Sequence, residues 1–426
     1  MKLSKIKIEG LFDLFDYTIP LENNENLLII TGPNGFGKTM ILNIIDSFFN
    51  NKLDFFHKLV FKSITIWTNE HKKFIIEKNK AENEIEASIF ANGIFITSHK
   101  HLLRKSNIFI SGSNKIISSI YYNLHSDILS ETKKHTEKEN IITEETNESF
   151  YERLDSLSNQ LKIYLIKEQR LLRRNPKKKK TDNSSDFFIQ SETEIFVIDT
   201  IEEYATELKD LINNNLDESY TITQQIDSTF PKRLLSEKGN LTVEEFNKRF
   251  NLLKLRQEKL KLFGLSESEQ EVPSYDEQNA NVLLVYLKDS EEKIKVFDSL
   301  VNKLELFTNI LNDRRFTFKS IKIDRKKGFI FLTKNGVELS LTDLSSGEQH
   351  EVVLLYELIF KTNPNTLVLI DEPEISLHVT WQKEFLSDLL KILELQKMQV
   401  IVATHSPQII NDRWDLVFNL ETQTMQ

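Results

Sequence analysis

The sequence predicts an α/β protein with a mixed β-sheet and an antiparallel β lobe, interrupted by a long α-helical, coiled-coil-like insertion. Short β-rich runs separated by polar or Gly-containing turns make up the first third of the chain. From about residue 150 to about 315 the sequence is charged, poor in glycine and apolar at helical spacing. The last third returns to strands and helices, which predicts that the helical middle is inserted into one α/β unit.

Local patterns predict the separate elements. Strands are expected at residues 3–12, 26–33, 62–68, 72–78, 84–90 and 93–98, and a helix directly after residue 38. Four amphipathic segments, which we expect to pair as antiparallel arms, occupy residues 150–172, 201–214, 242–263 and 290–311. Residues 316–340 predict a pair of strands, and the apolar runs at 365–370 and 399–404 predict buried strands.

Composition limits the possible classes of function. A chain of 426 residues is long enough for two or three structural units. No apolar run approaches the roughly 18 residues that a membrane span needs, so we expect no membrane contact. The absence of cysteine excludes disulfides and thiolate metal sites and fits the cytoplasm. The net charge of −9 argues against general nucleic-acid coating, so a DNA contact would need a local basic patch.

The strongest motif is GPNGFGKT, which fits the pattern G-x-x-x-x-G-K-[ST] between a predicted strand and a predicted helix. Glycines let the backbone wrap around phosphate oxygens, and the N–H groups at the helix start supply donors. Lys38 would reach the β- and γ-phosphates, and the Thr39 hydroxyl would bind Mg²⁺. A glycine turn that fits by coincidence is the alternative. The predicted nucleotide-binding residues here are Gly32, Pro33, Asn34, Gly35, Phe36, Gly37, Lys38 and Thr39.

A second motif is the apolar run TLVLI followed by Asp371 and Glu372. Two adjacent carboxylates are costly to bury without partners, so such a strand usually ends at a cation or in water. Asp371 would hold Mg²⁺, directly or through water, and Glu372 would orient and polarise an attacking water. A strand that simply emerges into solvent is the alternative.

Two weaker signals lie on either side of the acidic pair. LSSGEQ, with Ser345 and Gly347, precedes an apolar helix whose N-terminus could form a second anion site, or it could be an ordinary helix cap. His405 ends a predicted buried strand, where a lone histidine is often structural. The order of the four motifs along the chain favours the functional interpretation.

This order resembles the ABC ATPases, in which the signature motif of one subunit covers the γ-phosphate held by the Walker A loop of another. The resemblance implies ATP and Mg²⁺ as ligands, Lys38, Glu372 and His405 as catalytic residues, and Ser345 and Gly347 as nucleotide contacts from the second copy of a homodimer. It also implies an ABC-type head divided into residues 1–145 and 316–426, with a helical arm at 146–315.

The resemblance can be narrowed. LSSGEQ and DEPEISLHVTWQKEFLSDL look like the OLD-like and SMC-related ATPases, and unlike membrane transporters. Members of this size resemble ATPase subunits of bacterial phage-defence systems, notably AriA of PARIS and PtuA of Septu, which work with a TOPRIM and an HNH nuclease. The similarity is dense in about the first 45 residues and the last hundred. The chain ends about 20 residues after His405, so nuclease chemistry is expected from a partner.

Two departures from the family pattern concern the nucleotide site. No glutamine precedes Gln160, so the Q-loop glutamine is missing from the place where we expect it. Met40 stands where many relatives have a second hydroxyl residue, which should matter little because Thr39 is retained. For adenine, Phe12, Phe15 and Tyr17 are available for stacking, although aromatic residues at such spacing are usually core residues.

A basic cluster lies between the first two predicted helices. It could bind nucleic acid through phosphate contacts at the tip of an arm, but a solvated loop is the simpler interpretation. Its members are Arg170, Arg173, Arg174, Lys177, Lys178, Lys179 and Lys180. His99 and His101 alternate on a predicted strand without acidic or Cys partners in sequence, so we expect them to be surface residues.

The leading hypothesis is an antiphage-defence ATPase in which ATP, hydrolysed slowly, switches a homodimer that senses, scaffolds and regulates a nuclease. A RecF- or SMC-like ATPase that binds DNA through its arms for repair or maintenance is the alternative. A scaffold with structural ATP is a third possibility. A transporter ATPase is disfavoured, because the insertion is too long.

Overall fold

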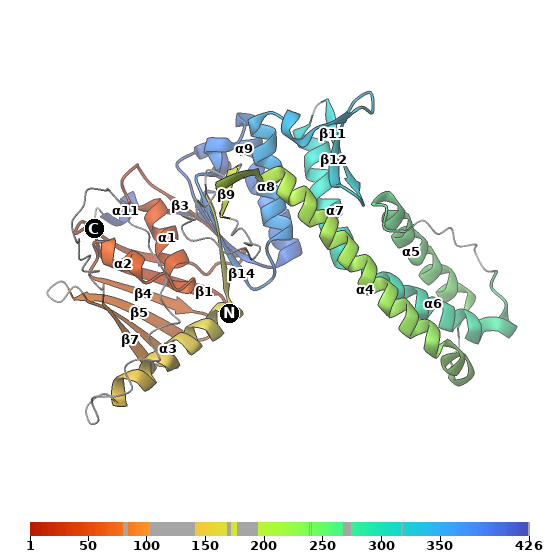
Figure 1. Ribbon diagram of the computed structural model, residues 1–426, viewed down its shortest axis with the longest axis horizontal. Helices are drawn as coiled ribbons and strands as arrows, with labels where there is room; N and C mark the ends of the chain where they lie inside the picture. Colours follow the sequence, from red (N-terminus) through yellow and green to blue (C-terminus); the bar gives the residue numbers. More distant parts are fainter. Residues whose placement is uncertain are drawn as a thin grey trace, which may run out of the picture.

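The computed structural model describes residues 1–79, 84–102, 141–167, 172–176, 195–237, 239, 241–266, 274–316 and 318–424. Figure 1 shows a head, which contains both termini, and a helical arm that projects from it. The predicted α/β architecture with an antiparallel lobe and a helical insertion is confirmed. None of the described helices combines the length and apolar character that crossing a bilayer requires.

The N-terminal lobe is a six-stranded antiparallel sheet with the order β2-β1-β4-β5-β6-β7. Buried residues alternate along β1 and β4, which is the pattern of a sheet with one face on a core. The strands are β1 (Leu3–Leu11), β2 (Phe15–Pro20), β4 (Ser63–Thr68), β5 (Lys72–Asn79), β6 (Glu84–Ala91) and β7 (Ile94–Leu102).

The second sheet is parallel, with the order β16-β3-β15-β14-β8. Its three middle strands are almost wholly buried, because both faces of the sheet are covered. The sheet comprises β3 (Leu27–Thr31), β8 (Lys162–Ile166), β14 (Thr366–Asp371), β15 (Gln399–Ala403) and β16 (Val417–Asn419).

Two hydrophobic cores lie on opposite faces of the parallel sheet. On β14, Leu367 and Leu369 join the core shared with the antiparallel lobe, whereas Val368 and Ile370 join the core shared with the C-terminal helices and the arm. Helix α1 (Lys38–Phe49) fills the first core, and α8 (Ser346–Phe360) and α9 (Val379–Gln396) contribute to the second. The edge of the sheet at which β3 and β14 end therefore lies between two packed layers.

The described part of the arm contains four α-helices and a short 3-10 helix, and it ends in a short π-helical turn before the chain returns to the head. Figure 1 shows α4 running the length of the arm, with α5 and α6 at its outer end. The elements are α4 (Thr200–Ser236), η1 (Glu277–Asn279), α5 (Val243–Leu262), α6 (Ala280–Lys295), α7 (Asp298–Ile310) and η2 (Leu311–Arg315). Ion pairs join α6 to α4, as between Lys293 and Asp227 at 2.7 Å.

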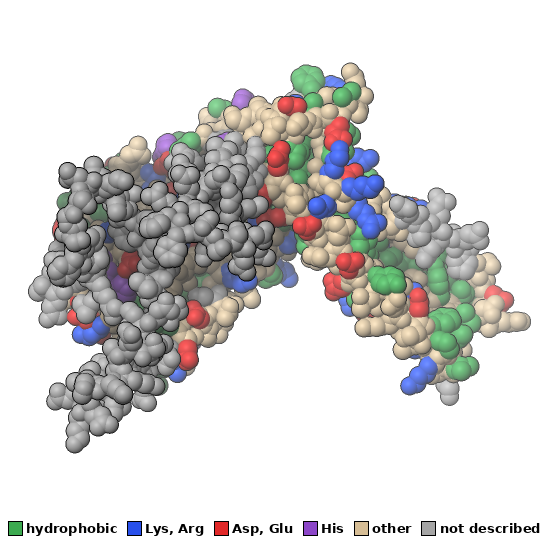
Figure 2. Space-filling view, viewed as in Figure 1, with side chains coloured by type: hydrophobic (Ala, Val, Ile, Leu, Met, Phe, Trp, Pro, Cys, Tyr) green, Lys and Arg blue, Asp and Glu red, His purple; other side chains and the backbone are tan. Residues whose placement is uncertain are grey.

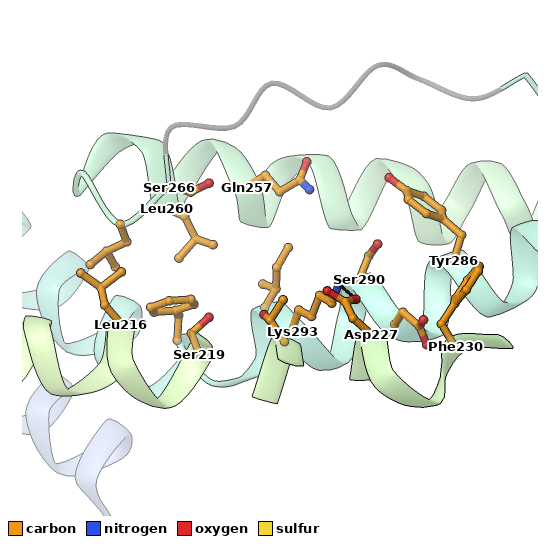
Figure 3. Close-up of a pocket in the computed structure, with 15 residues that line it drawn as sticks. Leu216, Ser219, Asp227, Phe230, Gln257, Leu260, Ser266, Tyr286, Ser290 and Lys293 are labelled. Carbon is orange, nitrogen blue, oxygen red and sulfur yellow. Dashed lines mark hydrogen bonds and ion pairs between the residues drawn. The ribbon is translucent and has the colours of Figure 1, made fainter. Parts of the chain in front are cut away.

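A cavity of about 510 Å³ lies between the outer helices of the arm (Figure 3). Leu216 and Phe230 of α4, Leu260 of α5 and Tyr286 of α6 border it, together with the Lys293–Asp227 pair. The cavity contains none of the residues predicted to bind nucleotide.

Residues 162–166 differ from the sequence-based expectation. The amphipathic run 150–172 predicted one helix. In the structure α3 (Ile141–Gln160) ends before residue 162, and residues 162–166 form β8, which pairs with β14. Pairing with a buried parallel strand outweighs local helical preference. The backbone at Arg173 and Arg174 forms β9 (Leu172–Pro176), which pairs with β10 (Ile195–Asp199) and is not the tip of a helical arm. The division at residues 145 and 316 stays a proposal.

The remaining described elements are short. Helix α2 (Asp54–Lys58) follows α1, and β11 (Lys319–Asp324), β12 (Gly328–Thr333) and β13 (Glu338–Leu339) form a small sheet beside the arm. The others are η3 (Leu341–Asp343), η4 (Pro373–Ser376), α10 (Pro407–Ile410), η5 (Trp414–Leu416) and α11 (Glu421–Thr424).

Gly328 fixes the approach of this small sheet to α4. Its φ is +82°, and a Cβ atom there would lie 1.9 Å from the carbonyl oxygen of Ala205. The backbone of β12 therefore contacts the backbone of α4 with no room for a side chain.

We predict that Gly328→Ala lowers the melting temperature by several degrees, because the Cβ must push β12 away from α4 in addition to straining the backbone. Gly336→Ala is the matched control, since Gly336 also has a positive φ of +76° but nothing lies within 4 Å of its Cβ position. Equal melting temperatures for the two variants, measured by differential scanning calorimetry, would contradict the contact.

The histidines of β7 are not simple surface residues, contrary to expectation. His99 is buried and its Nε2 lies 2.8 Å from the Tyr151 hydroxyl. His101 Nδ1 lies 2.8 Å from His57 Nε2, and its Nε2 lies 3.6 Å from Asp54. Burial lowers the pKa of His57, with His101 and Lys78 adding to the effect against the opposing charge of Asp54.

The pKa of His101 is also lowered, first by burial and then by His99, against the opposing effect of Asp54. Because both folded-state values lie below the ordinary 6.5, the unfolded chain takes up protons first on acidification. The free energy of unfolding should therefore be highest above pH 6.5 and should decrease as the pH falls below it.

We predict that the melting temperature falls between pH 7 and pH 5, and that the double variant His57→Gln, His101→Gln shows a flatter profile over this range. His71→Gln serves as the control for losing one histidine elsewhere in the lobe. Parallel profiles for the wild type and the double variant would show that the pair does not cause the pH dependence.

Candidate nucleotide site

The glycine-rich loop lies between β3 and α1, as predicted. Gly37 immediately precedes the helix with φ +87°, and a Cβ there would lie 3.1 Å from Leu11 Cδ2. Lys38 is buried, and its Nζ donates a 2.8 Å hydrogen bond to the carbonyl oxygen of Gly32. The loop is thus closed around its own lysine, whose ammonium could exchange this carbonyl for a phosphate oxygen.

Aromatic residues of the β lobe support the loop. The Tyr17 hydroxyl donates to the Phe36 carbonyl oxygen at 2.9 Å, and the Phe15 and Phe36 rings stack with centroids 5.3 Å apart. Tyr17 is fully buried, and burial raises its pKa to about 12, so it keeps its proton. Tyr17 is therefore a structural support, whereas Phe12 and Phe15 are half-buried and stay candidates for adenine stacking.

The acidic strand end meets the glycine-rich loop. Thr39 Oγ1 lies 3.0 Å from Asp371 Oδ1, although the two residues are 332 positions apart. Beside them is a cleft of about 250 Å³, lined by Thr39, Asn43, Leu165, Lys167, Asp371 and Glu372. The two strongest sequence motifs therefore share one cleft at the carboxyl edge of the parallel sheet.

The two oxygens fit a magnesium ion. Mg²⁺ prefers oxygen ligands in an octahedron at about 2.0–2.1 Å, which places neighbouring ligands roughly 3 Å apart. The observed 3.0 Å between Thr39 Oγ1 and Asp371 Oδ1 matches that spacing. Among the described residues no group of three or more His, Cys, Asp or Glu side chains could hold a metal, so nucleotide phosphates and water would have to complete the set.

Three residues that line the cleft were not predicted from the sequence, namely Asn43, Leu165 and Lys167. Asn43 lies one helical turn after Thr39, so the i, i+4 spacing of α1 could have indicated it. Lys167 follows β8, which sequence reasoning assigned to a helix. β8 brings the chain to this edge of the site. The missing Q-loop glutamine concerned residues before Gln160, and it stays a prediction. Gln169 lies outside the described residues.

Beyond Asp371 the backbone turns sharply. Glu372 has φ +42°, in the left-handed region, and its N–H donates to the Ala403 carbonyl oxygen at 2.9 Å. Its carboxylate lies 3.7 Å from His405 Nδ1. The predicted water-activating residue and the predicted switch histidine are therefore neighbours. A left-handed, non-glycine residue is strained, and such strain is concentrated at functional positions.

A third carboxylate, which sequence reasoning did not place in the site, lies beside His405. Glu374 Oε1 accepts hydrogen bonds from Thr404 Oγ1 at 2.7 Å and from the His405 backbone N–H at 3.0 Å. The same oxygen is 3.3 Å from His405 Nδ1. Before the structure, Glu374 was only one residue of the stretch that carries the family resemblance. Its burial distinguishes it from a solvated acidic residue.

Ser345 occupies the N-cap of α8 and does not line the cleft. Its Oγ lies 2.9 Å from Glu348 Oε2, and Lys319 Nζ lies 2.8 Å from the same carboxylate. Although burial alone would raise the pKa of Glu348, its bonds with Lys319 and Ser345 lower it. The exposed Ser345 is thus held rigidly, and a Cβ on Gly347 would meet nothing closer than Trp381 at 3.9 Å.

The side chains of the predicted basic cluster lie outside what the structure describes. Arg173 and Arg174 are described only by their backbone in β9, and Arg170 and residues 177–180 lie outside the described residues. Figure 2 shows Lys and Arg side chains interspersed with Asp and Glu along the arm, so the described part of that face has charges of both signs.

Curated relatives match parts of the chain. The retron Ec83 probable ATPase of Escherichia coli is 33% identical over 138 residues, covering 29% of this chain and 24% of that protein. Protein ea59 of Escherichia phage lambda is 30% identical over 114 residues, covering 27% and 20%. The chain thus spans about a quarter of the length of the curated relatives it matches.

Two further comparisons extend over most of the chain. The crystal structure of the SmcHead bound to the C-winged helix domain of ScpA covers 98% of this chain and 94% of that one, with a TM-score of 0.43 and 11% identity. The profile of the AAA_15 family, described as an AAA ATPase domain, matches residues 1–410. The chain therefore belongs to the AAA ATPase domain family.

Proposed function

We propose that this chain binds ATP with Mg²⁺ in the cleft at Thr39 and Asp371 and hydrolyses it slowly, as a switch. The observation that carries the proposal is the 3.0 Å approach of the Thr39 hydroxyl to the Asp371 carboxylate, since it unites a phosphate-binding loop with an acidic strand end. Membership of an ATPase family supports the same activity.

Each side chain at the cleft would have a separate role in hydrolysis. Lys38 would bind the β- and γ-phosphates, and the loop N–H groups at the start of α1 would share their charge. A magnesium ion held by Thr39 and Asp371 would neutralise charge on the phosphates. Glu372 would accept a proton from the attacking water, and His405 would donate a hydrogen bond toward the γ-phosphate.

The cleft of one copy lacks the signature residues, and this supports a shared site. Ser345 is exposed on the N-terminal end of α8 and does not line the cleft that contains Thr39. We infer that Ser345 and Gly347 contact the ATP held by a second copy of the chain. The open space around Gly347 fits this role, because a small residue lets a phosphate approach the helix N-terminus.

We further propose that nucleotide state regulates an effector in antiphage defence. The relative in a retron supports this assignment, as does the resemblance of the signature and the acidic strand end to ATPases of defence systems. A TOPRIM or HNH nuclease of the kind that serves AriA or PtuA would be the partner. Binding of DNA by residues 170–180 stays a prediction, because the side chains of that cluster are not described.

Lys38→Ala should weaken ATP binding by roughly 30-fold or more, because removing one partner of a desolvated charge pair costs about 2 kcal/mol or more. Titration calorimetry with ATP and Mg²⁺ measures the affinity. Lys52→Ala is the matched control, since Lys52 is an ion-paired, exposed lysine beyond the other end of α1. Unchanged affinity in the Lys38 variant would refute the site.

Glu372→Gln should keep ATP affinity and lower turnover by about 10²- to 10⁴-fold, because the amide binds where the carboxylate did but cannot accept a proton. Slower hydrolysis should prolong the ATP-bound dimer, which size-exclusion chromatography with ATP and Mg²⁺ would detect. Glu384→Gln, which changes a carboxylate on α9, is the control. Wild-type turnover by the Glu372 variant would remove that residue from the mechanism.

A further inference from the structure

Glu374 is a buried carboxylate that the proposed hydrolysis does not use. Only 8% of the residue is exposed, although it lies two positions from the half-buried Glu372. One carboxylate oxygen, Oε1, makes every polar contact described for the Glu374 carboxylate. The other, Oε2, is buried without a hydrogen-bond partner in the described part of the chain. Burying a carboxylate in this way costs free energy, which makes Glu374 a candidate for a functional role.

The contacts of Oε1 converge on the end of β15. Thr404 Oγ1 and the His405 backbone N–H both donate to it, and this fixes the carboxylate relative to the backbone that carries the imidazole. His405 Nδ1 then lies 3.3 Å from the same oxygen. Three groups, one from Thr404 and two from His405, therefore lie within 3.3 Å of the same oxygen of Glu374.

The imidazole itself has little other restraint. The His405 side chain is 49% exposed, so packing does not define its rotamer. Glu372 Oε1 lies farther from Nδ1, at 3.7 Å, and Glu372 would have to turn toward water during hydrolysis. In the described part of the chain, the ion pairs of the ring are with these two carboxylates, and from α9 the neutral Gln382 accepts a hydrogen bond from the neighbouring Ser406 hydroxyl.

We propose that Glu374 is a positioning residue for His405. By accepting a hydrogen bond from Nδ1–H, the carboxylate fixes the tautomer and the plane of the ring. The other nitrogen, Nε2, on the opposite edge of the ring, then becomes the one that faces bound phosphate. The catalytic part of this inference rests on the proposed ATP site, whereas the orientation of the ring does not.

The first experiment tests the orientation without nucleotide. Imidazole ¹⁵N NMR spectra are recorded for the full chain, and the His405→Ala spectrum assigns the signal of His405 among the nine histidines. The wild type should show Nδ1 protonated. Glu374→Leu should shift His405 to the Nε2-protonated form, whereas Glu374→Gln, which keeps an acceptor oxygen, should not. An unchanged tautomer in Glu374→Leu would overturn the proposal.

The second experiment tests the consequence through a double-mutant cycle of ATP turnover. Glu374→Leu should lower kcat about tenfold or more with KM changed less than about threefold, and Glu374→Gln should restore much of kcat. In a His405→Ala background, Glu374→Leu should have no further effect. Equal losses of kcat in both backgrounds would show that Glu374 does not act through His405.

Controls distinguish a wrong proposal from a variant that does not fold and from a protein that does not hydrolyse ATP. Thr404→Val removes one donor to Glu374 but leaves both contacts of His405, so it should change kcat much less than Glu374→Leu. If Glu374→Leu does not fold, Glu374→Ala, which also removes the acceptor, is compared in both backgrounds, and a loss of kcat only when His405 is present still supports the proposal. A wild type without ATP turnover would refute the proposed function, while the tautomer would still decide the role of Glu374.

Discussion

The meeting of Thr39 and Asp371 is the constraint on which the rest of the structure depends. Neither residue can reach the other unless β3, β15 and β14 lie in one parallel sheet in register, with α1 packed across it. Parallel strands present their carboxyl ends at the same edge, where the loops that follow can share a ligand. Two hydrophobic cores hold that edge from both faces, which limits how far the two oxygens can move apart.

The same sheet explains how a long insertion can be accommodated. The chain leaves the parallel sheet after β8 and returns through β11 and β12, and α4 packs against α8 on the way. The Tyr204 hydroxyl donates to Glu357 at 2.5 Å, and the Tyr204 and Tyr356 rings stack with centroids 4.4 Å apart. The root of the arm is thus joined by buried polar and aromatic contacts to the helix that begins with the signature motif. A displacement of α8 would therefore move the arm with it.

The sequence could predict those parts of the site in which a short motif determines the conformation of its own backbone. Glycines around Lys38, an apolar strand before Asp371 and a cap at Ser345 each determine their backbone within a few residues. Lys167 could not be found in this way, because its strand is defined by pairing with β14 and its local pattern favours a helix. Glu374 and the paired His57 and His101 depend on contacts between distant segments, which no local pattern encodes.

The central claim is that each ATP lies between the loop of one copy and the signature of another, and mixing two inactive variants tests it most directly. Lys38→Ala disables the loop, and Ser345→Arg blocks the signature, so each homodimer has two defective sites. A mixed dimer would contain one site with an intact loop and an intact signature. The account predicts that mixing the two inactive proteins restores ATP turnover, in proportion to the mixed dimer formed. No turnover in the mixture, with both variants folded and mixed dimers present, would contradict it.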